Sequence, residues 1–370
     1  MAVTVDDGVQ QKLQRIAELE ASQREPPPRA FGPYLLLSSM ARGGMGEVFL
    51  ARSGGAGLET LQKHCVVKTL RPHLTDDREY VTRFLDESRV VVQLSHRNIC
   101  QVFDVGLVGE RYYLAMELIA GQDLRTLADA TGPMPPALAI YIVGEVLEAL
   151  DYAHRLSDVR GVPLRLVHRD VSPQNSMVSY EGEVKLIDFG LAQSAVKVEK
   201  TSPQTVMSKL AYMSPEQLRG EPASPGIDLY AAAVVLCELL LGARFYGALS
   251  THETWLVAAR GGHRPQGFDR LEPGLSAILD RALAASAADR YRDALALRAA
   301  LLEWRTGQGL WADAPALRGA VQRHFTAAEE VLVTPSPVRP LLARSQLFPD
   351  LNGRVLRIGK MNPASPHPRT

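Results

Sequence analysis

The stretch that decides the fold of this chain is His168-Arg169-Asp170-Val171-Ser172-Pro173-Gln174-Asn175, and Asp188-Phe189-Gly190 begins thirteen positions after its last residue. The apolar step Leu166-Val167 leads into the first motif, and the run from Glu183 to Ile187 leads into the second. Short apolar or alternating runs of this kind predict β-strands. We therefore expect the acidic side chains of the two motifs at the ends of adjacent strands.

Asp170, Asn175 and Asp188 have the residue types and the spacing of a phosphoryl-transfer centre. In that chemistry an aspartate accepts the proton of the substrate hydroxyl, an asparagine five residues later holds a metal ion, and a second aspartate binds the Mg²⁺ on ATP. Each motif alone is more often a turn or a helix cap, so the prediction depends on the strands around it.

The composition is that of an ordinary soluble protein and limits the classes of partner. The chain has 370 residues, of which 46% are hydrophobic and 22% charged, with 41 basic and 41 acidic groups. A net charge of zero gives no electrostatic basis for binding nucleic acid or an anionic membrane. We therefore expect neither nucleic acid nor a membrane as a partner.

Three features favour a cytoplasmic location. Cys65, Cys100 and Cys237 lie far apart, in an odd number and without metal-ligand spacing, so a disulfide framework is not expected. The N-terminus has no apolar run of the kind found in secretory signals. The longest apolar segment, 229–243, contains Glu238 and is too short to span a bilayer, so it predicts a buried helix.

The hydrophobic pattern divides the chain into a β-rich part and a longer helical part. Short β-branched and aromatic runs between residues 31 and 116 predict an antiparallel sheet, interrupted by a helix at 77–94, and the chain is mostly helical after residue 123. The expected strands include 34–37, 48–50, 65–67 and 112–114. Outside this region, 8–22 predicts a short helix before a proline run, and 313–331 predicts a helix before a Pro-rich tail.

A glycine-rich segment and two distant charges form a second group of candidates. The segment Ala41-Arg42-Gly43-Gly44-Met45-Gly46-Glu47-Val48 lies between two expected strands, where backbone N–H groups can approach phosphates closely. Lys68 ends a short apolar run, and Glu87 follows nineteen residues later on the expected helix. An ion pair between them would hold the lysine on the α- and β-phosphates of ATP. A solvated lysine at a strand edge is the alternative.

The order of these motifs along the chain resembles that of a bacterial eukaryotic-like Ser/Thr protein kinase. The order is glycine-rich loop, strand lysine, helix glutamate, catalytic loop, Asp-Phe-Gly and then Ser214-Pro215-Glu216. The resemblance covers residues 31–306 and implies an α+β, two-lobed protein-kinase-like fold. A small β-rich N-lobe would span about 31–116 and a larger α-helical C-lobe about 121–306, with short extensions at 1–30 and 307–370.

The resemblance implies ATP and Mg²⁺ as cofactors, with Mn²⁺ as an alternative metal, and Ser/Thr hydroxyls of proteins, including the chain itself, as phosphate acceptors. Asp170 would be the catalytic base, Lys68 with Glu87 would hold the phosphates, and Asn175 with Asp188 would bind the metal. The residues that would bind the nucleotide are Ala41, Gly43, Gly44, Gly46, Val48, Lys68, Met116, Glu117, Ile119 and Asp123, the last at the ribose.

Further positions extend the resemblance into the helical part. Asp228 looks like the start of the buried helix that anchors the catalytic loop, and Arg290 would pair with Glu216. Arg169 precedes the catalytic aspartate, and in kinases with this arginine a phosphorylated residue of the activation segment pairs with it. The preferred candidates for that phosphorylation are Thr201 and Thr205.

The chain departs from the family pattern at three positions. Ala41 stands where the first glycine of the loop is usual, and Ser172 replaces a lysine that touches the γ-phosphate. Lys209 replaces a threonine ahead of Tyr212. The last two changes exchange an ammonium and a hydroxyl between side chains that face each other in the family. We therefore expect Lys209 to be a catalytic residue that supplies the charge missing at Ser172, with a solvent-facing lysine as the alternative.

Three other functions stay open at this point. A pseudokinase scaffold would explain Ala41 and Ser172, but the intact Lys68 and the metal and base residues argue against it. A small-molecule phosphotransferase of kinase-like fold generally lacks a segment that ends in a Pro-Glu pair. Tyrosine specificity is disfavoured by Pro173 and by the missing arginine beside Asn175. The sequence leaves open the substrate, the activating signal, the formation of a homodimer and the role of residues 307–370.

Overall fold

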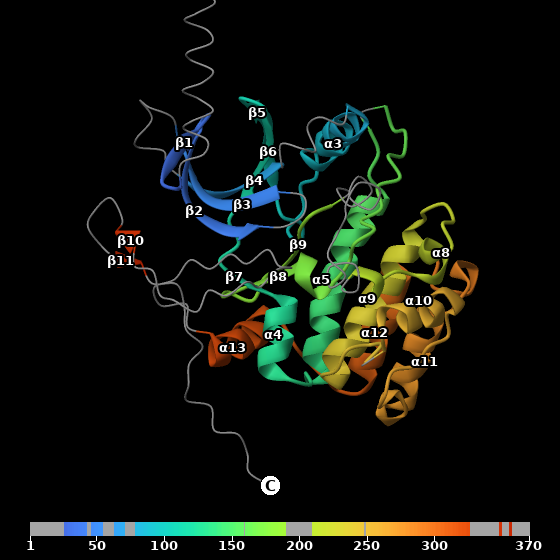
Figure 1. Ribbon diagram of the computed structural model, residues 1–370. Coiled ribbons are helices and arrows are strands. Elements are labelled where there is room, and N and C mark those ends of the chain that lie inside the picture. The colour runs from blue at the N-terminus through green and yellow to red at the C-terminus, as the bar shows by residue number, and fades with distance from the viewer. Residues whose placement is uncertain are drawn as a thin grey trace, which may run out of the picture. The chain divides into compact units, whose positions relative to one another are not determined.

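The computed structural model describes residues 26–42, 46–54, 63–70, 78–158, 160–189, 209–247 and 249–325, and two short strands at 348–349 and 355–356. Within these residues the chain divides into two compact units (Figure 1). The first contains the residues up to Gln93 and Gln101–Leu118, and the second contains Leu94–Cys100 and the residues from Ile119 onward. The helix expected at 8–22 lies outside the described residues.

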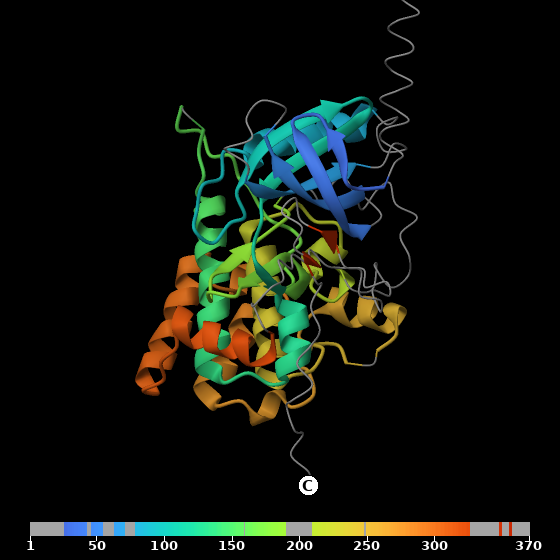
Figure 2. The ribbon, with the colours of Figure 1, turned by 90° about the vertical axis from the view of Figure 1, so that its left-hand side faces the viewer.

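The first unit is a six-stranded antiparallel sheet with one helix, α3 (Arg78–Val91). The strands follow the order β1-β2-β3-β4-β6-β5 and form one twisted sheet (Figure 2). They are β1 (Arg29–Phe31), β2 (Tyr34–Arg42), β3 (Gly46–Ser53), β4 (His64–Leu70), β5 (Val102–Val108) and β6 (Arg111–Glu117). The strands expected at 34–37, 48–50, 65–67 and 112–114 are confirmed as parts of β2, β3, β4 and β6, whereas β1 and β5 were not expected.

One face of this sheet carries the apolar core of the first unit. Successive side chains of a strand point to opposite faces, so Phe49 and Ala51 of β3 share the buried face. At one edge of this core, the Asp104 carboxylate accepts hydrogen bonds from the hydroxyls of Tyr34, at 2.7 Å, and Tyr113, at 2.8 Å. Burial and these bonds to a carboxylate raise the pKa of both tyrosines. The shared acceptor ties β5 to β2 and β6.

The second unit is mainly helical and contains a three-stranded sheet. The strands of that sheet are β7 (Gly121–Asp123), β8 (Ser176–Ser179) and β9 (Val184–Leu186). The helices are α4 (Leu124–Thr131), α5 (Pro136–His154), α8 (Pro215–Leu218), α9 (Pro225–Leu241), α10 (Thr251–Arg260), α11 (Pro273–Ala282), α12 (Ala294–Gly307) and α13 (Ala314–His324), with short 3₁₀ helices at Pro173–Asn175, Phe268–Arg270 and Ala287–Asp289.

Helix α9 forms the centre of the second unit and packs along α5 (Figure 1). Every residue from Ile227 to Leu240 is buried, which explains why this helix is apolar on all sides. Pro225 begins it, where a missing N–H has no cost, and Gly242 ends it in the left-handed conformation with φ 62°. The buried helix expected at 229–243 is thereby confirmed.

Other expected elements differ in their bounds. Helix α3 lies within the expected range 77–94. The helix expected at 313–331 is α13, which ends at His324, and residues 326–331 are outside the described residues. In the C-terminal tail, β10 (Phe348–Pro349) pairs with β11 (Val355–Leu356) where little structure was expected. None of the helices in the described ranges is long and apolar enough to cross a membrane.

Candidate active site

The Asp228 carboxylate, in the first turn of α9, holds the beginning of the catalytic loop, His168–Asn175. Its oxygens accept hydrogen bonds from the backbone N–H groups of His168 and Arg169, each at 2.8 Å. The His154 Nε2, at the end of α5, lies 2.8 Å from the same carboxylate. Asp228 is 1% exposed, and a buried carboxylate is costly unless donors surround it. The loop is therefore fixed to the most buried helix of the unit.

Two residues of the site, Arg169 and Asp188, adopt the left-handed backbone conformation, with φ of 68° and 60°. This conformation costs a side-chain-bearing residue about 1 kcal/mol or more, so surrounding bonds must impose it. At Arg169 the N–H donates to Asp228, and the carbonyl accepts from Gln217 Nε2 at 3.2 Å. Non-glycine residues held in this region cluster at active sites.

His168 connects the two motifs. Its Nε2 lies 3.0 Å from the carbonyl oxygen of Ile187, and its Nδ1 accepts the backbone N–H of Asp170 at 3.3 Å. Because Nδ1 is the acceptor, the proton belongs on Nε2, where it is donated to Ile187. The imidazole ring also meets the edge of Phe189 with ring centroids 4.4 Å apart. This buried histidine thus holds Asp170 and Asp188 in one region.

The strand expected at Leu166-Val167 is wrong. These residues pair with none of the described strands, because the amides that follow them are bound by Asp228, and Arg165 just before them is left-handed with φ 49°. The paired strands are instead β8, directly after Asn175, and β9, which ends two residues before Asp188. The ladder continues through the Ile187 N–H, which donates to the Asn175 carbonyl at 2.9 Å. It is therefore Asn175 and Asp188 that stand at adjacent strand ends.

The oxygens of Asn175 and Asp188 fit a hard divalent cation. The Asn175 Nδ2 donates to the carbonyl of Asp170 at 2.7 Å, which assigns the amide nitrogen and makes Oδ1 the atom that could bind a metal. Within the described ranges no group of three or more His, Cys, Asp or Glu side chains could hold a metal. Mg²⁺ usually takes one or two protein oxygens and completes its shell with phosphates and water, so two oxygens suit it.

Lys209 reaches the candidate base. Its Nζ lies 3.1 Å from Oδ2 of Asp170, and the two side chains are 23% and 17% exposed. A turn that begins at Lys209 and closes with the Tyr212 N–H on the Lys209 carbonyl at 3.1 Å directs the chain toward α8. The solvent-facing alternative for Lys209 therefore does not describe this structure. Ser172 is buried at 6% exposure and carries no charge.

The segment from Tyr212 to Leu218 is built as a rigid platform. Ser214 caps α8 in a reciprocal pair with Gln217, which satisfies the free N–H groups at the start of the helix. Behind it, Arg290 binds Glu216 through two hydrogen bonds of 2.7 and 2.8 Å, and both side chains are buried. The pair expected between Glu216 and Arg290 is confirmed. Burial would raise the pKa of Glu216, but its bonds to Arg290 outweigh this effect and lower the pKa.

A second buried network was missed in the sequence. Arg125 of α4 contacts Glu238 of α9, and both bind the Tyr212 hydroxyl, which lies 2.6 Å from Arg125 Nη2 and 2.7 Å from Glu238 Oε2. The Phe245 N–H donates to the other Glu238 oxygen at 2.9 Å. Burial and the nearby Glu238 raise the pKa of Tyr212. A glutamate inside an apolar helix was the available signal, because a buried charge requires a partner.

In the first unit, three of the expected nucleotide-binding residues lie in one row across neighbouring strands. Ala41 of β2 is opposite Val48 of β3, which is opposite Lys68 of β4. Gly46 begins β3 so close to its neighbour that an added Cβ would lie 1.7 Å from the Thr69 carbonyl oxygen. Glu87 is half-buried on α3. Gly43 and Gly44 lie outside the described residues.

The remaining nucleotide candidates follow in the chain. Met116 and Glu117 end β6, and the Glu117 carboxylate accepts the Gln101 N–H at 2.8 Å. Ile119 is buried. Asp123 is 1% exposed and caps α4, with its oxygens bound by the N–H and the hydroxyl of Thr126 at 3.0 and 2.7 Å. Burial raises the pKa of Asp123, although the Thr126 bonds oppose this. Each carboxylate oxygen can still accept a second hydrogen bond.

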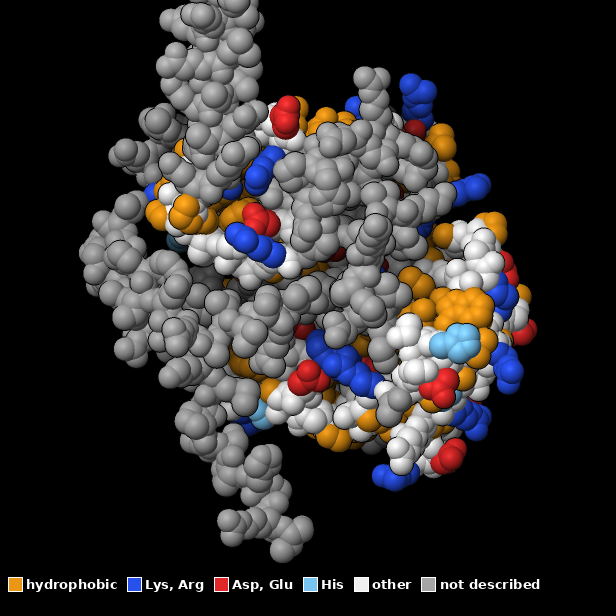
Figure 3. Space-filling view, viewed as in Figure 1, with side chains coloured by type: hydrophobic (Ala, Val, Ile, Leu, Met, Phe, Trp, Pro, Cys, Tyr) orange, Lys and Arg blue, Asp and Glu red, His pale blue; other side chains and the backbone are white. Residues whose placement is uncertain are grey.

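The described surface of the second unit also exposes apolar side chains over α10 (Figure 3). Trp255 and Leu256 are 43% and 47% exposed on this helix. Thr201 and Thr205, the expected phosphorylation sites, lie outside the described residues, as does Gly190 of the second motif.

Comparison with known proteins defines the class. Residues 34–290 match the family model described as the protein kinase domain. The tyrosine-protein kinase MasK of Myxococcus xanthus is 35% identical over 284 residues, which are 75% of this chain and 43% of MasK. The serine/threonine-protein kinase PknL of Mycobacterium tuberculosis is 35% identical over 297 residues, which are 76% of this chain and 69% of PknL.

A solved structure agrees with these relatives. The crystal structure of the Mycobacterium tuberculosis PknI kinase domain matches with a TM-score of 0.57 and 28% identity, over 75% of this chain and 98% of that domain. The chain belongs to the protein kinase family, and the expected kinase fold is confirmed. It spans less than half of MasK and about two thirds of PknL, since the matches cover 43% and 69% of those proteins.

The Glu216–Arg290 pair predicts how stability depends on pH. The pKa of Glu216 is lower in the folded chain than the ordinary value of 4.5, so the pair stabilises the fold above that pH, and its contribution falls as the pH drops below it. Glu216→Gln should lower the unfolding free energy by about 3 kcal/mol at neutral pH, because it leaves Arg290 buried without its counter-charge. Thermal and denaturant melts from pH 7 to about pH 3 should show this difference shrinking in acid.

The control for this measurement is Glu221→Gln. Glu221 pairs with Arg219, but the two side chains are 50% and 42% exposed, so the change should cost well under 1 kcal/mol. A Glu216→Gln deficit that stays constant across the pH range would contradict the assignment.

Proposed function

We propose that the chain transfers the γ-phosphate of ATP to Ser and Thr hydroxyls of proteins, including its own. The observation that carries this proposal is the loop with Asp170 and Asn175, which Asp228 fixes and His168 links to the segment of Asp188, together with the platform locked by Glu216 and Arg290. The first three provide a base and two metal-ligating oxygens, and the platform distinguishes a protein kinase from a small-molecule phosphotransferase. A cytoplasmic protein substrate fits the composition of the chain.

In the proposed mechanism, Asp170 orients the substrate hydroxyl and accepts its proton while the oxygen attacks the γ-phosphorus. Asn175 and Asp188 hold Mg²⁺, or Mn²⁺, which when bound neutralises charge on the phosphate oxygens. Lys68, positioned by Glu87, binds the α- and β-phosphates, while the backbone of Gly43, Gly44 and Gly46 covers them. The remaining nucleotide contacts would come from Ala41, Val48, Met116, Glu117, Ile119 and Asp123.

Ser and Thr are favoured over Tyr as acceptors. Pro173 follows the Ser/Thr-kinase pattern, and no arginine stands beside Asn175 as it does in tyrosine kinases. PknL is named a serine/threonine kinase, whereas MasK is named a tyrosine kinase. Phosphoamino-acid analysis of the reaction product separates these two outcomes. No observation favours a pseudokinase, because the charged groups that transfer needs are all present.

The charges of the site should be indispensable for transfer but not for folding. Lys68→Met, Asp170→Asn and Asp188→Asn should each reduce phosphate incorporation by about a thousandfold or more, because each removes a charge that acts on the reacting phosphates. The measurement is incubation with γ-labelled ATP and Mg²⁺, alone and with a generic basic protein. Thermal melts without nucleotide should show that the variants fold. Equal incorporation by wild type and Asp188→Asn would rule out the kinase assignment.

We further propose that Lys209 supplies the cation that Ser172 lacks. The hydroxyl held by Asp170 must lie within reach of the γ-phosphoryl group, so an ammonium 3.1 Å from Asp170 is close to the developing charge. Such a preorganised cation is worth about 3 kcal/mol, or two orders of magnitude in rate. Ion pairs between fully exposed groups contribute much less, and these two side chains are largely shielded.

Lys209→Ala should therefore reduce turnover by about a hundredfold with little change in affinity for ATP. The double change Ser172→Lys with Lys209→Thr should restore activity to within about tenfold of wild type, because it returns one ammonium and one hydroxyl to the site. Both are measured as kcat and KM for ATP on the same peptide substrate. If Lys209→Ala stays within about threefold of wild type, the compensation proposal is wrong.

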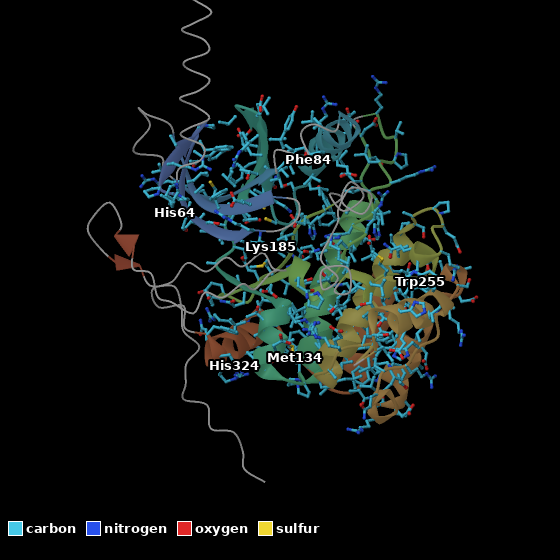
Figure 4. The ribbon with its side chains drawn as sticks, viewed as in Figure 1. His64, Phe84, Met134, Lys185, Trp255 and His324 are labelled. Atoms are coloured by element: carbon cyan, nitrogen blue, oxygen red, sulfur yellow. The ribbon has the colours of Figure 1, made fainter. Side chains whose placement is uncertain are left out.

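The matched control for Lys209→Ala is Lys63→Ala, because Lys63 is exposed in the first unit. Lys185 is half-buried on β9 (Figure 4) and makes a poorer control.

We also propose that a phosphorylated residue of the activation segment binds Arg169. The Nε of Arg169 is buried, and no hydrogen-bond partner for it lies among the described residues. A phosphate offers three acceptor oxygens and would order the segment that leads to Lys209.

Replacing Thr201 and Thr205 together by alanine should lower the activity of the purified kinase by about tenfold, since no phosphate would then pair with Arg169. Mapping of phosphopeptides from active wild-type protein should find modification between residues 193 and 212. Thr306→Ala, at an exposed position in the last turn of α12, serves as the control. Active protein without phosphate in this segment would exclude activation by this route.

A further inference from the structure

Helix α13 lies beyond the residues that match the kinase family, yet it is docked on the second unit. The match ends at residue 290, whereas α13 spans Ala314–His324 and contacts α4. Asp313 caps its first turn, and Leu317 and Val321 are 0% exposed. Figure 4 labels His324 at its C-terminal end. An amphipathic helix with a fully buried apolar face is held by packing against its neighbours.

The same helix contacts the turn between β8 and β9. The Gln322 side chain donates to the backbone carbonyl of Tyr180 at 3.3 Å. Gly182, in the left-handed conformation with φ 86°, lies so close to α13 that an added Cβ would stand 2.1 Å from the Ala314 carbonyl oxygen. Only glycine fits there without displacing α13 or the turn. The Arg318–Glu181 ion pair at 2.9 Å joins two exposed side chains and contributes little.

Tyr180 links α13 to β7 and to the residue before it. Its N–H donates to the Ala120 carbonyl at 2.8 Å, and its hydroxyl accepts from the Gln122 side chain at 2.9 Å in a buried bond. Strand β7 pairs with β8, with Gly121 opposite Ser179 and Asp123 opposite Met177. Tyr180 is thus bound by α13 through its carbonyl and by the β7 segment through its amide and hydroxyl.

Two series of contacts connect α13 to Asp123. The first runs through Tyr180 and Gln122 to β7, which ends at Asp123. The second runs through α4, which Asp123 caps and against which α13 packs. A flexible β7 would lose conformational freedom when a nucleotide binds, whereas a strand held beforehand would not. Pre-ordering of this kind raises affinity without adding a contact.

We propose that α13 is a positioning element of the nucleotide site, which holds β7 and Asp123 ready for the sugar of ATP and so sets nucleotide affinity without touching the nucleotide. Tyr180, Gly182 and Gln322 are its positioning residues. This inference rests on the proposed binding of ATP by Asp123. It concerns affinity and not the transfer step, because Asp170 and Lys209 lie on other segments.

The first test compares two alanine substitutions in the full-length chain. Gly182 and Gly161 are both left-handed, with φ of 86° and 80°, but nothing lies within 4 Å of a Cβ added at Gly161. Backbone strain is therefore common to both variants, and only Gly182→Ala collides with α13. Calorimetric titration with Mg²⁺ and ATP should give about fivefold weaker binding for Gly182→Ala, the equivalent of one lost hydrogen bond. Gly161→Ala should bind like wild type.

Kinetics of the same two variants separate positioning from general damage. For Gly182→Ala, the KM for ATP should rise by about fivefold while kcat stays within about twofold, because the transfer residues are undisturbed. A fall in kcat of Gly182→Ala as large as the rise in KM would overturn the proposal, because it would show general damage to the site and not positioning. Hydrogen exchange of residues 314–324 reports whether α13 has left its site.

The second test is a double-mutant cycle of Tyr180→Phe and Gln322→Ala, read as ATP affinity. If α13 acts through Tyr180, the double variant should be weakened by less than the product of the two single effects. If hydrogen exchange shows that α13 is released in Gly182→Ala while the affinity for ATP is unchanged, the proposal is wrong. If α13 stays docked in Gly182→Ala, the double-mutant cycle decides. The proposal is then wrong if the double variant is weakened by the full product of the two single effects on ATP affinity. Absence of phosphate transfer by the wild-type chain would instead refute the proposed function, while the calorimetric titration and the double-mutant cycle, which measure ATP binding, would still test this proposal.

Discussion

The catalytic loop of the second unit depends on the carboxylate of Asp228. It accepts two consecutive backbone N–H groups of the catalytic loop and contacts His154, so one side chain on the buried helix α9 fixes where that loop begins. With those amides held, Arg169 is kept in a conformation that it would not adopt alone. Asp170 follows directly on the two residues whose amides are held in this way. Loops usually move more than helices, and here a helix residue removes that freedom.

Buried acids join distant segments of the second unit at several places. Asp228 joins α9 to the catalytic loop, Glu216 joins the platform to Arg290, and Glu238 joins α9 to Tyr212. Each acid is at most 4% exposed and is bound by several donors. Removal of one partner of such a group leaves a charge in an apolar interior, which is far more costly than loss of a surface pair. The interior of the unit therefore tolerates few alternative arrangements of these segments.

Local spacing made the centre of the site predictable. His168–Asn175 and Asp188 follow one another at fixed intervals, and the departure at Ser172 directed attention to Lys209, which contacts Asp170. The strand at Leu166-Val167 was mistaken because two apolar residues in a row do not reveal that the amides after them bind a side chain sixty positions away. Patterns of hydrophobicity describe neighbours in sequence, whereas this loop is shaped by a remote carboxylate.

Contacts between distant residues account for the other gaps. Strand β5 escaped notice because few of its residues are fully buried, so its sequence shows no clear alternation. The Arg125–Glu238 contact joins residues 113 positions apart. The helix at 313–331 was predicted, but the surface on which it docks was not. The apolar residues of a helix predict a buried face without indicating which element covers that face.

The buried face of α13 affects where the folded unit can be divided. Leu317 and Val321 are 0% exposed, so this face of the helix is covered completely. A chain shortened at residue 306 would keep all the kinase motifs but would expose the apolar surface of α4 and the β8–β9 turn to water. Exposed apolar patches of this kind promote self-association. Solubility, more than the reach of the family motifs, therefore argues for keeping α13 in any shortened form of this chain.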